Sequence, residues 1–166
     1  MLNNSSLEKA TEGELIEDLP ETFQHAIRVA KSVGINYIWI DALCVLVDPD
    51  NSHDEVAFEM ARAHDIFNGA CFVIAASRSG AQYDGFLHQR KSRDFLRFEN
   101  NPYGTFYICE AIDDFDQDVL AGPMHQRAWA FQERVFARRT VFYGQKQMYF
   151  ECGGGIRCET LSLIRK

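Results

Sequence analysis

Helical and strand-like segments alternate in the first half of the chain, and this alternation limits the possible fold more than any other feature. Residues 20–33 and 53–68 carry apolar side chains at helical spacing, whereas residues 35–41 and 71–77 are short runs rich in β-branched and aromatic residues. A helix–strand–helix–strand order is typical of α/β proteins, in which helices cover a parallel sheet. We therefore predict an α/β fold in which strands 35–41 and 71–77 are parallel members of one sheet and the two helices lie on its faces.

The second half of the chain departs from this alternation. Residues 80–122 are rich in turn-forming and charged side chains and are interpreted as an insertion that packs against the sheet, with a strand at 105–109. A third helix is expected at about residues 126–137. A C-terminal β-hairpin follows, with its strands at 140–143 and 147–150.

Length, charge and cysteine content exclude several classes of protein. The 166 residues suit one domain, placed at 19–166 after a flexible tail at 1–18. With 17 basic and 24 acidic residues the net charge is -7, which disfavours binding to nucleic acid or to an anionic membrane. The longest apolar run, at 70–76, is far shorter than the roughly 20 residues of a membrane span. Five cysteines without a Cys-x-x-Cys pair favour reduced thiols in a cytoplasmic protein, and no metal site is expected.

The third predicted helix carries the most informative pattern. Trp129, Gln132, Glu133 and Phe136 are spaced so that they share one face of the helix. A carboxylate beside aromatic rings loses contact with water, which raises its pKa, whereas a nearby arginine such as Arg127 lowers it. Two interpretations stay open: Glu133 is a functional carboxylate, or it forms a structural ion pair.

The ends of the two predicted strands supply the other candidates. Asp41 ends one strand and Ser77 and Arg78 end the next, and ligands of open parallel sheets bind beyond the carboxyl ends of the strands. The simpler interpretations are a turn acceptor for Asp41 and a structural hydroxyl for Ser77. Cys44 has no recognisable histidine base, which favours a packing residue over a nucleophile. We expect Asp41, Ser77 and Glu133 to converge on one cleft.

Three blocks of sequence follow one another in a characteristic order: LPETF at 19–23, YIWIDALC at 37–44 and RAWAFQER at 127–134. Together with YFEC at 149–152, they resemble the heterokaryon-incompatibility (HET) domain of filamentous fungi over about residues 19–152. Members of that family trigger cell death when incompatible fungal strains fuse. The family is distantly similar to Toll/interleukin-1-receptor (TIR) domains, so the resemblance implies a TIR-like, flavodoxin-like parallel sheet.

The resemblance also implies an activity. Many TIR domains cleave NAD at the nicotinamide–ribose bond with a glutamate four residues after a tryptophan, and Trp129 and Glu133 have that spacing, although Ala130 replaces the family's cysteine. Glu133 is thus the implied catalytic residue and NAD the implied substrate, with no cofactor or metal. The residues expected to bind the substrate are Asp41, Cys44, Ser77, Arg78, Arg127, Trp129 and Gln132.

Two departures from the family pattern affect these expectations. Leu46 and Val47 replace an asparagine and a glutamine that often follow the cysteine. Family members also usually begin with a strand similar to Tyr-x-Ala-Leu-Ser-Tyr-x-Trp-Gly, which this sequence lacks, so the chain is either a fragment or a short form. We expect a homodimer, or a displaced segment such as 104–109 beside Trp39, to fill the gap. The alternative to NAD cleavage is a non-enzymatic, self-assembling signalling module that recruits death machinery.

Overall fold

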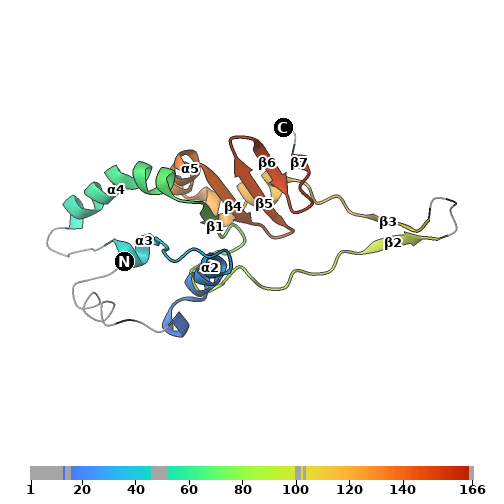
Figure 1. Cartoon of the computed structure of the whole chain (residues 1–166), viewed down its shortest axis with the longest axis horizontal. Helices are drawn as coiled ribbons and strands as arrows, with labels where there is room; N and C mark the ends of the chain where they lie inside the picture. Colours follow the sequence, from blue (N-terminus) through green and yellow to red (C-terminus); the bar gives the residue numbers. More distant parts are fainter. Residues whose placement is uncertain (1–12, 14–15, 46–51, 100–101, 103, 165–166) are drawn as a thin grey trace.

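The computed structural model describes residue 13 and residues 16–45, 52–99, 102 and 104–164 (Figure 1). The helices are α2 (Glu21–Ser32), α3 (Asp41–Cys44), α4 (Ser52–Gly69) and α5 (Ala128–Phe136), with short helical turns η1 (Ile16–Asp18), η2 (Asp116–Leu120) and η3 (Pro123–Gln126). The strands are β1 (Val73–Ala75), β2 (Phe95–Phe98), β3 (Phe106–Cys109), β4 (Arg139–Tyr143), β5 (Met148–Cys152), β6 (Gly155–Cys158) and β7 (Leu163–Ile164). Among the described residues, no helix combines the length and the apolar character that crossing a membrane requires.

Five strands form the main sheet, in the order β1-β4-β5-β6-β7. Strand β1 runs parallel to β4, with Ile74 opposite Val141, and the other neighbours are antiparallel. The predicted α/β class is confirmed, and the predicted C-terminal hairpin is β4 with β5. The chain then turns back at Gly153 and Gly154 into β6, so the antiparallel part of the sheet is larger than the hairpin alone.

Residues 35–41 do not form a strand of this sheet, which corrects the sequence prediction. The backbone is extended at Ile40 (φ -133, ψ 122), yet within the described residues 35–40 no strand pairing occurs. Asp41 begins the single turn α3, and its carboxylate accepts a hydrogen bond from the amide of Ala42 at 2.7 Å. Residues 35–40 do not pair with β1 because a cleft, lined by residues of both segments, lies between them. Strand β1 pairs on its other edge with β4. An apolar, β-branched sequence does not by itself distinguish a paired strand from an unpaired extended segment.

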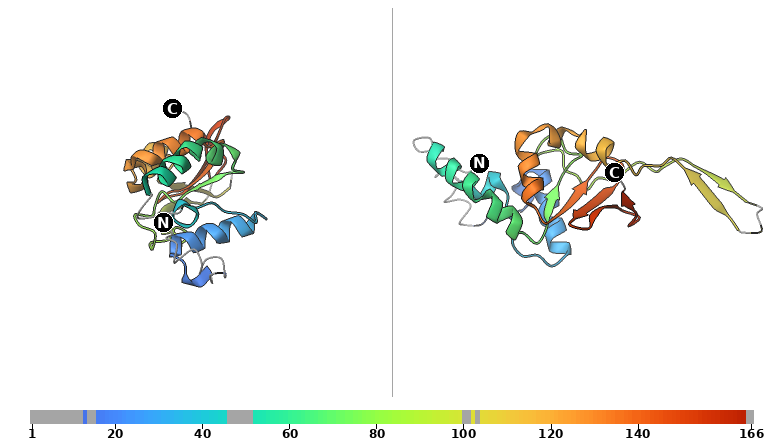
Figure 2. Two further views of the ribbon diagram at one scale, coloured as in Figure 1. Left: turned by 90° about the vertical axis from the view of Figure 1, so that its left-hand side faces the viewer. Right: turned by 90° about the horizontal axis from the view of Figure 1, so that it is seen from above.

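The three predicted helices are confirmed. Helix α2 corresponds to the prediction for 20–33 and α4 to that for 53–68. Helix α5 begins only at Ala128, because Pro123 opens a short 3-10 turn before it. Helices α4 and α5 pack against each other beside the sheet (Figure 2). The interpretation of residues 1–18 as a tail lies largely outside the described residues.

The insertion at residues 80–122 has two parts that differ in their packing. Its base joins the core, where the ring of Phe115 meets that of Phe142 edge to face with centroids 5.1 Å apart. Its middle, β2 and β3, forms a separate antiparallel hairpin that projects from the body (Figures 1 and 2). The predicted strand is confirmed as β3, but it pairs with β2. The expectation that segment 104–109 lies beside Trp39 is therefore wrong within a single chain.

A buried polar network holds the base of the insertion against the turn between β4 and β5. The carboxylate of Asp118 accepts hydrogen bonds from the amides of Lys146 at 2.9 Å and Gln147 at 3.2 Å. The side-chain amide of Gln147 and the hydroxyl of Tyr149 donate to the carbonyl of Ile112, at 3.0 and 3.1 Å. Burial raises the pKa of Tyr149 to about 12, so its hydroxyl stays protonated and remains a donor near neutral pH.

Helix α2 is held by the loop of residues 79–88. The buried side chain of His25 accepts hydrogen bonds at Nδ1 from the amides of Phe86 at 2.9 Å and Leu87 at 3.1 Å. Gly85 lies beside this ring with a φ of +65, and a Cβ there would lie 2.7 Å from His25 Cε1. Only glycine suits both this backbone conformation and the close approach to the ring. The two hydrogen bonds to His25 then hold α2 against the loop.

The stability of the fold should depend on pH through His25. Burial lowers its pKa below the ordinary value of 6.5, and a proton on Nδ1 would also break both hydrogen bonds. Because the folded state favours the neutral ring, this contribution to stability is complete above pH 6.5 and is lost as the pH falls through the folded-state pKa. In urea unfolding, the loss of free energy of unfolding between about pH 7.5 and 5.5 should be smaller for His25→Gln than for the wild type. The exposed His64→Gln should keep the wild-type dependence, and an unchanged dependence in His25→Gln would contradict the assignment.

A bidentate ion pair joins α5 to the sheet. Nε and Nη2 of Arg134 donate to the two carboxylate oxygens of Glu151, each at 2.7 Å. The two side chains are 19% and 26% exposed, and the guanidinium lies 5.1 Å from the ring centroid of Phe115. The hydrogen bond to Glu151 raises the pKa of Arg134 above the ordinary value for arginine. The arginine in this structural ion pair therefore has Glu151 as its partner, and not Glu133.

Loss of one charge in this ion pair should destabilise the fold. Glu151→Gln leaves a largely buried guanidinium without its counter-charge, which should cost about 1–3 kcal/mol of unfolding free energy. The matched control is Glu110→Gln, whose exposed ion pair with Lys146 should contribute less than about 1 kcal/mol. Chemical denaturation of both variants tests this, and equal effects would show that the Arg134 ion pair has no special role.

Candidate functional site

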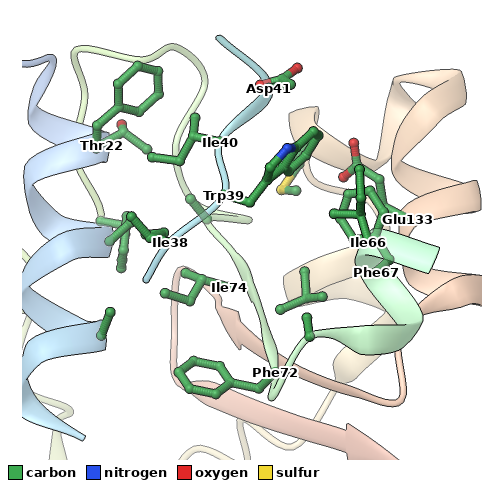
Figure 3. Close-up of a pocket in the computed structure, with 18 of the residues that line it drawn as sticks. Thr22, Ile38, Trp39, Ile40, Asp41, Ile66, Phe67, Phe72, Ile74 and Glu133 are labelled. Carbon is green, nitrogen blue, oxygen red and sulfur yellow. The ribbon is translucent and has the colours of Figure 1, made fainter. Parts of the chain in front are cut away.

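A cleft of ≈ 640 Å³ lies between α2 and the β1 edge of the sheet, within the usual size range of small-molecule sites. The walls come from α2, the extended segment 35–40, the end of α4 and β1 (Figure 3). The apolar lining residues labelled in that view are Ile38, Trp39, Ile40, Ile66, Phe67, Phe72 and Ile74. Within the described residues, the 79–88 loop holds α2, and the edge of β1 that faces the cleft pairs with no strand.

Three charged residues of the predicted site line this cleft. Asp41 is the first residue of α3, Arg127 immediately precedes α5, and Glu133 lies within α5. Figure 3 shows Glu133 next to the Trp39 indole, with Asp41 above that indole. Segments more than 80 positions apart in the sequence therefore bring an acidic pair and a guanidinium to one apolar cleft.

Glu133 is a half-buried carboxylate whose pKa is raised. Burial raises its pKa above the ordinary value of 4.5, the neighbouring carboxylate of Asp41 raises it further, and the guanidinium of Arg127 lowers it. Among the described residues, no ion pair to Glu133 is formed. A partly desolvated carboxylate that faces a cleft without a direct cationic partner is typical of binding and catalytic sites. Such a group can exchange a proton or stabilise a cation.

The aromatic ring beside Glu133 belongs to Trp39. Its indole also meets the ring of Phe67 edge to face, with centroids 5.7 Å apart. Trp129, four residues before Glu133, is 52% exposed and is not among the residues that line the cleft. Gln132 is likewise exposed outside the lining. Of Trp129, Gln132 and Glu133, which share one face of α5, Glu133 is the residue that lines the cleft.

Three other predicted site residues lie outside the lining. Cys44 is exposed at the end of α3. Ser77 is 1% exposed, and within the described part of the chain its hydroxyl has no hydrogen-bond partner. Arg78 donates to the carbonyl of His88 at 3.2 Å and so supports the 79–88 loop. The structure thus brings Glu133 together with Asp41 but not with Ser77.

Sequence reasoning missed Trp39 as a site residue, although a signal was present. Residues two positions apart in an extended segment point to the same side, and this rule, applied to the run that ends at Asp41, would have indicated Trp39 as its neighbour. The contribution of α4, which brings Asp65 and Phe67 to the cleft, has no comparable signal. It arises from packing between helices that are distant in the sequence.

Metal ligands do not gather in this cleft or elsewhere in the described part of the chain: no group of three or more His, Cys, Asp or Glu side chains could hold an ion there. The guanidinium of Arg127 is the lining group suited to an anionic part of a ligand, and the rings of Trp39 and Phe67 are suited to a planar part.

The fold and the cleft define an α/β domain with a mixed sheet, whose acidic residues gather at one side of an apolar cleft. The family model described as Heterokaryon incompatibility protein (HET) matches residues 3–133, which is most of the chain. The chain therefore belongs to the heterokaryon incompatibility protein family, and this membership supports a role in heterokaryon incompatibility. The match includes Asp41, Arg127 and Glu133 and ends before β4. No curated protein and no solved structure matches the chain.

Replacing the cleft carboxylate should not destabilise the fold. The folded-state pKa of Glu133 is raised, so the protein favours the protonated form, and stability is lost as the pH rises from about 4.5 through the folded-state pKa. Glu133→Gln removes this penalty, so its melting temperature should equal or exceed that of the wild type at neutral pH. The difference in melting temperature between Glu133→Gln and the wild type should narrow as the pH falls toward 4.5. A large drop in melting temperature at pH 7 would instead show that Glu133 is a structural partner.

Proposed function

We propose that this domain induces cell death in heterokaryon incompatibility by cleaving NAD in the cleft, with Glu133 as the catalytic residue. The observation that carries the proposal is the raised pKa of Glu133 beside Asp41, Arg127 and the Trp39 ring in one cleft. The family match supports the biological setting and includes all four of these residues.

The reaction requires stabilisation of a positively charged sugar. The bond between the anomeric carbon of the ribose and the nicotinamide nitrogen breaks, and the electron pair leaves with nicotinamide. Water then adds to the anomeric carbon and releases a proton, giving ADP-ribose. The transition state resembles that of glycoside hydrolysis, with positive charge on the ribose. A carboxylate that is partly removed from water interacts strongly with such a charge.

The remaining lining groups match the other parts of NAD. The ring of Trp39 offers a flat apolar surface for the nicotinamide. The nicotinamide ring of NAD is positively charged, so its approach favours the ionised form of Glu133. Arg127 is available for the pyrophosphate, since a guanidinium donates paired hydrogen bonds to phosphate oxygens. The free thiols of all five cysteines fit the reducing cytoplasm in which we expect the protein to act.

A second candidate function is a self-assembling signalling module that recruits the death machinery without catalysis. The observation that favours it is the β2–β3 hairpin, which carries exposed apolar side chains away from the body of the protein. The two functions are compatible, because assembly and catalysis can occur in the same domain.

Release of nicotinamide from NAD by the purified chain tests the first candidate. Glu133→Gln keeps the shape of the side chain but removes its charge, so the rate should fall by roughly a hundredfold or more. Glu110→Gln, the same change at an exposed carboxylate that does not line the cleft, should leave the rate unchanged. If the wild-type chain releases no nicotinamide at high protein concentration, or if Glu133→Gln retains full activity, NAD cleavage through this residue is excluded.

A further inference from the structure

The β1 edge of the cleft is built to accept a strand. Strand β1 pairs with β4 alone, and residues 35–40, which share the cleft with β1, are extended without a strand partner in the described chain. Unpaired backbone donors and acceptors on two extended segments are a template for an added strand. The β1 segment contributes Phe72, Val73, Ile74 and Ala76 to the lining, so apolar residues of this strand border the cleft.

The β2–β3 hairpin of the same chain projects away from the body of the protein (Figure 1). Every residue of β2 and of β3 is exposed. The large apolar side chains on this hairpin are Phe95, Leu96, Phe98, Phe106, Tyr107 and Ile108. An isolated two-stranded hairpin is at best marginally stable in water, and this one projects beyond the rest of the molecule (Figures 1 and 2). A contiguous exposed apolar surface of this kind marks an interaction site.

Charge supports a match between these two surfaces. The acidic residues Asp41, Asp65 and Glu133 line the cleft. The basic residues Lys91 and Arg93 lie on the exposed irregular segment that leads into β2. Opposite charges around an apolar contact fix the orientation of the partners and disfavour wrong ones.

We propose that the β2–β3 hairpin of one copy of this chain docks in the cleft of a second copy, where one of its strands pairs with the free edge of β1. The contact joins two different surfaces, so it forms either a reciprocal dimer or an open chain of copies. The apolar part of the cleft around Phe72 and Ile74 receives the hairpin, and Asp41 lies toward the other end (Figure 3). This inference rests on the assembly role offered above as the second candidate and does not require NAD cleavage.

Two variants separate the surfaces. The hairpin variant combines Leu96→Lys and Ile108→Glu, which replaces an exposed cross-strand apolar pair by an ion pair that preserves the hairpin. The cleft variant is Ile38→Lys. If Ile38→Lys fails to fold, the exposed Asp65→Lys reverses a charge at the cleft without removing a packed side chain. Circular dichroism establishes that each variant is folded.

Light scattering and sedimentation of the full chain in reducing buffer, without NAD, measure the assembly. The wild type should associate with increasing concentration, and each variant alone should associate at least about tenfold more weakly. A mixture of the two variants retains one intact hairpin and one intact cleft, so it should form a one-to-one complex that grows no further.

Three outcomes would overturn the proposal: a wild-type chain that stays monomeric at all concentrations, a folded cleft variant that associates as the wild type does, or a mixture without the one-to-one complex. The second outcome would indicate contact between hairpins instead. Nicotinamide release is measured separately, so failure of assembly and failure of catalysis are distinguishable.

Discussion

The attachment of α2 to the 79–88 loop is the constraint on which the site depends. His25 accepts two backbone hydrogen bonds from this loop, and Gly85 allows the loop to approach its ring. The helix is therefore positioned by a loop and not by a strand beneath it. Its apolar face, including Phe23 and Ala26, lines the cleft instead of being covered by the sheet. If α2 packed directly on β1, the cleft between them would close, and no ligand-sized space would remain.

The rest of the molecule divides into a buried part and an exposed part. The buried part comprises the core and the polar network around Asp118 and Gln147, whose polar groups are paired by hydrogen bonds. The exposed part comprises the β2–β3 hairpin and the unpaired segment 35–40. The described chain thus leaves strand edges unpaired and apolar side chains exposed on the outside, while hydrogen bonds pair the buried groups around Asp118 and Gln147. Exposed strand edges and apolar side chains are features that solubility alone would disfavour.

Local sequence patterns predicted the elements whose formation depends on local interactions. The helical spacing of 20–33 and 53–68 and the turn between the hairpin strands were sufficient for α2, α4 and the β4–β5 pair. They failed at residues 35–41, because strand pairing depends on a partner that the run itself does not specify. For the site, helical spacing indicated Glu133 as a partly desolvated carboxylate, but not that Trp39 would be the ring beside it. That juxtaposition is a property of tertiary packing, as is the β2–β3 pairing.

The bidentate contact between Arg134 and Glu151 has one more consequence. Neighbouring residues of a helix point in directions about 100° apart, so fixing Arg134 on the sheet also fixes the rotation of α5 and with it the direction of Glu133. Glu151 belongs to β5, on the far side of β4 from the cleft edge. The sheet therefore sets the orientation of Glu133, and a change in β5 can reorient this carboxylate without altering any residue that lines the cleft.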